Sequence, residues 1–181
     1  EAMNWPDHIG VAVNLSPAQF KMRNLSLTVM SVLAQSGLAA HRLELEITEA
    51  VLLVNNQATL ETLHQLRNLG VRIAMDDFGT GYSSLSYLRG FPFDKIKIDR
   101  SFVRGLASSA DSKAIIRAVA GLGSDLGMRT TGEGVETQEE LDYLRNEGCT
   151  EAQGYFLSTP RPASEVLQLL SKRQTAAKAV A

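Results

Sequence analysis

The chain has 181 residues, of which 44% are hydrophobic and 21% are charged, and its formal net charge is -2. These proportions are typical of one compact globular domain, and no apolar run is long enough to cross a bilayer. No cluster of lysine and arginine is present, which excludes long polynucleotides as partners. One cysteine and three scattered histidines exclude a zinc site of the usual spacing, so any metal would need oxygen ligands.

Short β-branched apolar runs alternate with longer amphipathic stretches, and this alternation predicts repeated parallel βα units. The predicted strands are 10–14, 43–48, 71–76, 95–99, 128–133 and 151–155. The predicted helices are 25–36, 57–69, 112–126, 138–147 and 163–171. Glycines stand where four of these helices end, as expected for residues that accept the left-handed backbone of a helix C-terminus. These glycines are Gly37, Gly70, Gly127 and Gly148.

Repeated βα units fit both an open doubly wound sheet and a closed (β/α)8 barrel. Polar residues at or just after the carboxyl ends of five predicted strands favour the barrel, because barrel enzymes build their sites at that rim. They are Asn14, Glu46, Asp76, Asp77, Asp99 and Glu133. Six strands do not close a barrel, so we expect about two more strands before Glu1. Residues 1–171 are then a partial barrel, and 172–181 a weakly ordered tail.

Asp76 and Asp77 follow the apolar run VRIAM and begin the segment DDFGTGYSSL. Adjacent carboxylates at a strand end point in different directions, so one can bridge two cations while the other binds one. Like charges about 4 Å apart repel by about 4 kcal/mol at an effective dielectric of about 20, so the rim carboxylates need neutralisation. Two divalent cations would nearly balance them, and oxygen ligands favour Mg²⁺ or Mn²⁺ over Zn²⁺.

Two other residues suit the same rim. Asn14 offers a neutral amide oxygen, and Lys97 points to the opposite side from Ile96 and Ile98 in KIKID. Taken singly, each has a structural explanation, because an asparagine can cap a helix and a strand lysine can extend its amine into solvent. Their common position at one rim favours the functional interpretation.

Six motifs occur in order along the chain: NLSPAQF, LELEITE, DDFGTGYSSL, KIKIDRSFV, GEGVET and EAQGYF. Together they resemble the EAL family of cyclic di-GMP phosphodiesterases, from about Val11 to Pro162. The resemblance implies a TIM-like (β/α)8 barrel of the EAL type. It also implies a hydrolase of bacterial second-messenger signalling that converts cyclic di-GMP to linear pGpG with two Mg²⁺ or Mn²⁺ ions.

The resemblance further implies which residues hold the metals. Asn14, Glu46 and Asp76 would bind the first ion. Asp76 would bridge to the second ion, which Asp77 would bind with help from Asp99.

Four other residues receive roles from the resemblance. Lys97 would orient water and phosphate, and Glu133 would act as general base or as a water-holding neighbour of the metals. Gln153 would contact the water or metal shell. Glu49 would anchor the loop after Asp77, which would support metal binding and a homodimer contact.

The sequence departs from the family pattern at two places. Gly132 stands where the family commonly has alanine, a small-for-small change that we expect to be harmless. No Glu-Ala-Leu signature precedes Asn14, although in the family this motif supplies a further metal-binding glutamate and, shortly after, a phosphate-binding arginine. We therefore expect the isolated chain to bind metal poorly, whatever the activity of its parent protein.

Two other functions stay open. A non-catalytic cyclic di-GMP receptor is one, although degenerate family members usually lose the metal carboxylates that are present here. An unrelated metal-assisted barrel hydrolase is the other, but the later loops contain no glycine-rich phosphate cradle. We also expect a cytoplasmic domain with fused or partner sensory or GGDEF domains, anchored to a membrane only through regions outside this chain.

Overall fold

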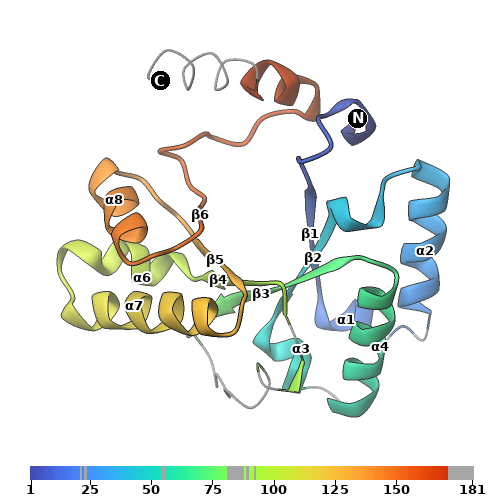
Figure 1. The fold of residues 1–181 in the computed structure, drawn as a ribbon, viewed down its shortest axis with the longest axis horizontal. Helices are drawn as coiled ribbons and strands as arrows, with labels where there is room; N and C mark the ends of the chain where they lie inside the picture. The colour runs from blue at the N-terminus through green and yellow to red at the C-terminus, as the bar shows by residue number, and fades with distance from the viewer. Residues whose placement is uncertain are drawn as a thin grey trace.

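The computed structural model describes residues 1–170 except 21, 23, 54, 55, 81–87, 89 and 92. Its six strands form one parallel sheet in sequential order, and Figure 1 shows this sheet curling with helices around its outside. The strands are β1 (Val11–Leu15), β2 (Leu43–Thr48), β3 (Arg72–Phe78), β4 (Lys95–Ile98), β5 (Arg129–Gly132) and β6 (Glu151–Ala152). β1 and β6 are its two edges, so the described chain is a partial barrel, as predicted.

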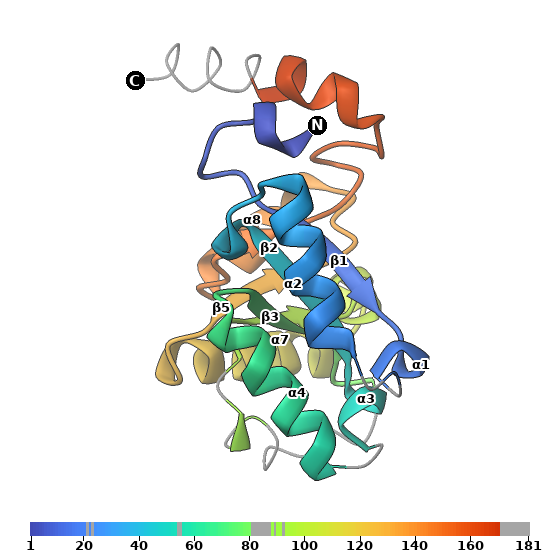
Figure 2. The same ribbon diagram turned by 90° about the vertical axis from the view of Figure 1, so that its right-hand side faces the viewer.

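The helices connect successive strands and cover the outer face of the sheet (Figure 2). They are α1 (Pro17–Phe20), α2 (Leu25–Ser36), α3 (Glu49–Leu53), α4 (Asn56–Asn68), α6 (Arg100–Arg104), α7 (Ala110–Asp125) and α8 (Gln138–Asn146). Short 3-10 turns are η1 (Ala2–Asn4), η2 (Ala40–Arg42), η3 (Gly105–Ala107) and η4 (Ala163–Glu165), and 166–170 form a further helical turn. None of the helices in these ranges combines the length and apolar character that a membrane span requires.

The predicted elements agree with the structure except at their ends and in three short helices. Sequence periodicity did not predict α1, α3 or α6, because four or five residues are too few to show a helical repeat. The predicted strand 151–155 is wrong beyond Ala152. Gly154 lies there against the backbone of Val135, so close that an added Cβ would be 2.1 Å from the Val135 carbonyl oxygen. The predicted tail at 172–181 lies outside the described residues.

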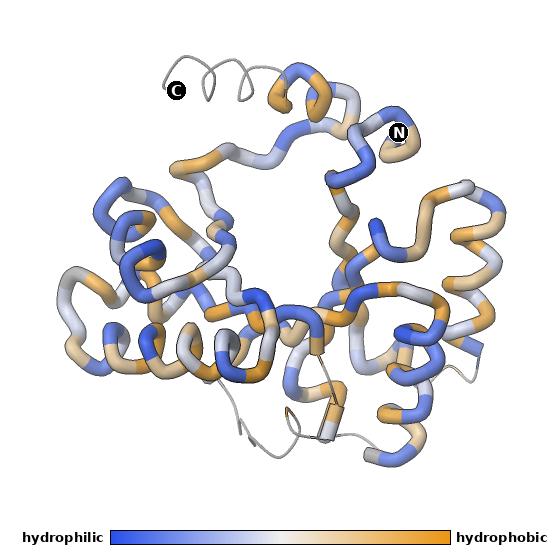
Figure 3. Tube along the Cα trace, in the orientation of Figure 1, coloured by the Kyte–Doolittle hydropathy of each residue, from blue (hydrophilic) through white to orange (hydrophobic). Residues whose placement is uncertain are grey.

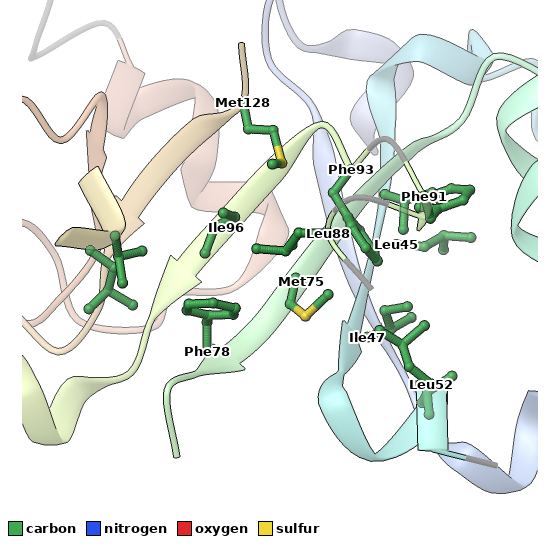
Figure 4. Close-up of a cluster of buried hydrophobic side chains, with 14 of the residues drawn as sticks. Leu45, Ile47, Leu52, Met75, Phe78, Leu88, Phe91, Phe93, Ile96 and Met128 are labelled. Atoms are coloured by element: carbon green, nitrogen blue, oxygen red, sulfur yellow. The ribbon is translucent and has the colours of Figure 1, made fainter. Parts of the chain in front are cut away.

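The strands place apolar side chains outward, against the helices. In β4, Ile96 and Ile98 are completely buried in the core cluster, which also contains Met75, Phe78 and Phe93 (Figure 4). The helices supply the matching apolar faces, and along α4 and α7 hydrophobic and hydrophilic residues alternate (Figure 3). This hydrophobic layer lies between sheet and helices and fixes the positions of the strand ends.

The inner face of the sheet carries charged residues instead. Near the amino ends of the strands, Lys95 contacts Glu44 at 2.6 Å and Glu151 at 2.7 Å. Arg129 contacts the same two carboxylates at 2.9 Å and 2.7 Å. Two cations and two carboxylates therefore neutralise one another, which offsets the cost of removing them from water. The alternation of LELEIT and KIKI on β2 and β4 thus separates a charged inner face from an apolar outer face.

Candidate active site

The predicted site residues gather at the carboxyl ends of the strands. Asn14 on β1 is the direct partner of Glu46 on β2, and Thr48 at the end of β2 is the partner of Asp76 on β3. Because all six strands are parallel, these ends meet at one rim. Asn14 is exposed on the edge strand, whereas Glu46 and Asp76 are buried.

Lys97 lies at the centre of this rim. Its Nζ atom is 2.7 Å from Glu46 Oε2, 3.0 Å from Asp76 Oδ1 and 2.7 Å from Glu133 Oε1. The lysine is 4% exposed, so the three ion pairs lie in a poorly solvated environment. One side chain of β4 therefore joins carboxylates from β2, from β3 and from the segment after β5.

A strand irregularity brings the second aspartate to the same place. The register between β3 and β4 shifts between Met75 and Phe78, and Asp77 has a φ of 54°. Non-glycine residues rarely adopt this left-handed conformation, although aspartate tolerates it better than most. As a result, oxygen atoms of Asp76, Asp77 and Glu133 lie within 4.8 Å of one another. A regular strand would point two adjacent carboxylates to opposite faces.

Asp99 lies beside this group but also has a structural role. Its Oδ1 atom accepts a hydrogen bond from the Ser101 backbone N–H at 2.9 Å and one from the Ser101 hydroxyl, which caps the amino end of α6. Burial alone would raise the pKa of Asp99, but the bonds from Ser101 outweigh it and lower the pKa. Asp99 therefore stays ionised at the rim.

The pKa shifts of the other groups follow from their burial and from the charged groups around them. Burial raises the pKa of Asp77, and the nearby negative charges of Asp76 and Asp99 raise it further. Burial also raises the pKa of Glu133, against the opposing influence of Lys97. For Lys97, burial would lower the pKa, but its hydrogen bonds to Glu133 and Glu46 outweigh this effect and raise it. Lys97 accordingly favours its charged form.

Two further predicted residues directly follow strand ends at the rim. Glu49, the first residue of α3, accepts a hydrogen bond from the Gly79 N–H at 3.2 Å, so it holds the start of the loop after Asp77. The backbone of Gln153 bonds on both sides of Glu133: its N–H donates to the Gly132 carbonyl at 2.9 Å, and its carbonyl accepts from the Val135 N–H at 3.0 Å. The rest of the loop, at 81–87, lies outside the described residues.

Sequence reasoning missed one charged residue at this rim. Arg100 follows Asp99, is exposed, and is near enough to Asp77 for its positive charge to oppose the rise in the pKa of that carboxyl. Gly134, with a φ of 70°, leaves room for it, since an added Cβ would lie 2.5 Å from Arg100 Cβ. The sequence signal was the motif KIDR, in which an arginine directly follows a predicted metal ligand.

The charges of this rim suit divalent cations. Five carboxylates stand against the buried Lys97 and the exposed Arg100, which leaves a surplus of negative charge that divalent ions would offset. All the donors are oxygens, the preferred ligands of Mg²⁺ and Mn²⁺. The fold and the site together define a parallel βα-barrel protein with an acidic, oxygen-lined centre at its carboxyl-terminal rim.

Comparisons with known proteins identify the family. The EAL domain family matches residues 1–160. The chain is 42% identical over 157 residues to the bifunctional diguanylate cyclase/cyclic di-GMP phosphodiesterase MucR of Pseudomonas aeruginosa, covering 87% of this chain and 23% of that protein. Two solved structures, of the MucR phosphodiesterase in complex with c-di-GMP and of a manganese/cy-diGMP complex of Klebsiella pneumoniae BlrP1, are also similar. The MucR structure has a TM-score of 0.83 and 41% identity, and the match covers 87% of this chain and 64% of that one. The BlrP1 structure has a TM-score of 0.78 and 36% identity, and the match covers 83% of this chain and 39% of that one.

The chain therefore belongs to the EAL domain family. It spans between a fifth and a quarter of the length of curated relatives that it matches, with shares of 21%, 20% and 24% for three of them.

Proposed function

We propose that this chain forms most of a domain that hydrolyses one phosphodiester bond of cyclic di-GMP to give linear pGpG. One observation carries the proposal: carboxylates from two strands and from the segment after a third converge on Lys97 within 3.0 Å, and Asp77 joins two of them. The names of the MucR relative and of the MucR complex, which include this activity and this nucleotide, support it.

The proposed cofactor is a pair of Mg²⁺ or Mn²⁺ ions. When bound, they would acidify the attacking water and stabilise charge on the entering and leaving oxygens. The proposed ligands are Asn14, Glu46, Asp76, Asp77 and Asp99. The surplus of negative charge supports this assignment, and so does the manganese in the similar BlrP1 structure.

The residues of the chain would then divide the reaction between them. The water oxygen forms a bond to phosphorus, and the bond from phosphorus to the 3′ oxygen breaks. The 3′ oxygen takes up a proton to become a hydroxyl, and the product keeps a 5′ phosphate. Glu133 would accept the proton of the attacking water or hold that water in place, and Lys97 would hold a phosphate oxygen. Gln153 would contact the same water shell, and Glu49 would keep the loop after Asp77 in position through Gly79.

Turnover by the natural full-length protein tests this proposal. With Mg²⁺ or Mn²⁺ it should convert cyclic di-GMP to pGpG, detected by liquid chromatography and mass spectrometry, and excess chelator should stop the reaction. Glu133→Ala should reduce kcat by a factor of about 10² to 10⁴. Glu139→Ala, which changes an exposed glutamate on α8, is the matched control and should leave kcat unchanged. Full turnover by Glu133→Ala would remove Glu133 from the mechanism.

The second candidate is a non-catalytic receptor for cyclic di-GMP. Its distinguishing result would be tight nucleotide binding in excess chelator, with no pGpG formed when Mg²⁺ or Mn²⁺ is supplied. The retained carboxylates favour the enzyme, because a receptor does not need a surplus of negative charge around a phosphate.

The remaining properties stay predictions. A homodimer contact through the loop after Asp77 involves residues outside the described ranges. A cytoplasmic location and fused or partner sensory or GGDEF domains are predictions for the parent protein. The name of the MucR relative, which combines a cyclase with a phosphodiesterase, supports the GGDEF association.

A further inference from the structure

We propose that Arg100 binds the second phosphodiester of the substrate, the one that is not cleaved. The inference rests on the proposed function and adds a residue that determines specificity for a cyclic dinucleotide over a simple phosphodiester. A cyclic dinucleotide carries two negative phosphodiesters in one small ring. Only one of them can occupy the reacting position, so the other needs a separate partner at the rim.

Arg100 lies where such a partner is needed. It is the first residue of α6 and directly follows Asp99 at the end of β4. Its Cβ and Cγ lie against Gly134, the neighbour of Glu133. The side chain therefore starts between two residues of the acidic rim and is exposed to solvent.

The other cations described at this rim are already engaged. Lys97 contacts three carboxylates, and Arg104, one turn after Arg100 on α6, forms an ion pair with Glu136. Within the described ranges, the Arg100 guanidinium forms neither a hydrogen bond nor an ion pair. A guanidinium suits a phosphodiester because its planar set of N–H groups can donate two parallel hydrogen bonds to two oxygens.

Two substrates separate this role from a general electrostatic one. Cyclic di-GMP has a second phosphodiester, whereas bis(4-nitrophenyl) phosphate has only one. In the natural full-length protein, Arg100→Gln should raise the KM for cyclic di-GMP about 10- to 100-fold, the loss expected for one charge-assisted hydrogen-bonding contact. Hydrolysis of bis(4-nitrophenyl) phosphate should be unchanged, and Arg100→Lys should recover part of the affinity for cyclic di-GMP.

A matched control and a metal titration complete the test. Arg104→Gln removes a guanidinium that is also exposed but forms an ion pair with Glu136, and it should leave the hydrolysis of both substrates unaffected. Mn²⁺ affinity, measured by titration calorimetry, should be no weaker in Arg100→Gln, because the substitution removes a positive charge near Asp77 and Asp99.

Two results would overturn the inference. One is an unchanged KM for cyclic di-GMP in Arg100→Gln. The other is an equal loss for both substrates, which would place Arg100 at the reacting phosphate or the metals. Failure of the proposed function is distinguishable, because it would appear as a wild-type protein that hydrolyses no cyclic di-GMP.

Discussion

Lys97 and Glu133 form an ion pair, with Nζ and Oε1 2.7 Å apart, although Lys97 is on β4 and Glu133 follows β5. The same ammonium contacts Glu46, which is 51 residues away in the sequence. Removal of this cation would leave three carboxylates close together in a poorly solvated place. We therefore expect the replacement of Lys97 to change the stability of the protein strongly.

Lys97→Met should therefore destabilise the metal-free protein by about 3 to 5 kcal/mol, the usual cost of breaking a buried ion pair. Added Mn²⁺ should restore part of the loss, because it supplies positive charge to the same carboxylates. Urea unfolding with chelator and with Mn²⁺ measures both effects. Lys95→Met is the control, since Lys95 also contacts two carboxylates but at the other end of the strands. It should lose stability without being rescued by Mn²⁺.

Asp77→Gly should stabilise the metal-free protein and abolish turnover. The left-handed backbone at Asp77 costs a non-glycine residue about 1 kcal/mol, and glycine adopts it without that cost. The substitution also removes a charge that Asp76 and Asp99 repel. Chemical denaturation in chelator should show the gain, and the phosphodiesterase assay the loss. A drop in stability would mean that the Asp77 side chain contributes to the fold.

Gly134→Ala should cost more stability than Gly148→Ala. Both glycines have a positive φ, at 70° and 86°, so both substitutions introduce backbone strain of about 1 to 2 kcal/mol. Only at Gly134 would the added Cβ also collide with Arg100. At Gly148, no heavy atom of the described residues, other than those of the glycine and its chain neighbours, lies within 4 Å of the corresponding position. Thermal unfolding of the two variants measures the difference. Equal losses would show that the contact with Arg100 is relaxed easily.

Acid should destabilise the wild-type protein more than it destabilises the Glu151→Gln variant. Burial would raise the pKa of Glu151, but its bonds to Lys95 outweigh burial and, with Arg129, lower the pKa below its usual value. A carboxyl with a lowered folded pKa stabilises the protein above its unfolded pKa of about 4.3, and this stabilisation is lost as the pH falls through the folded pKa. Urea unfolding at pH 6 and pH 3 should therefore show a smaller decrease in the free energy of unfolding for Glu151→Gln.

Much of the fold could be predicted from local sequence, because strand and helix periodicities act over a few residues. The alternation in KIKID placed Ile96 and Ile98 outward and Lys97 inward, and this prediction is confirmed by their burial and contacts. Parallel strands then put all carboxyl ends at one rim, so the candidate residues could be named without coordinates. The metal and substrate roles assigned to them stay predictions.

The remaining features depend on contacts between segments distant in the sequence. Nothing in DDFG alone required the register shift that points Asp76 and Asp77 toward Glu133. The four-residue ion network of Lys95, Arg129, Glu44 and Glu151 was likewise invisible, because its members come from four strands. The sequence by itself therefore determined the order of the elements and the end of the sheet that carries the candidate site residues. The tertiary structure decided which of those charges meet, because Coulomb interactions depend on distances in space that only the curvature and register of the sheet set.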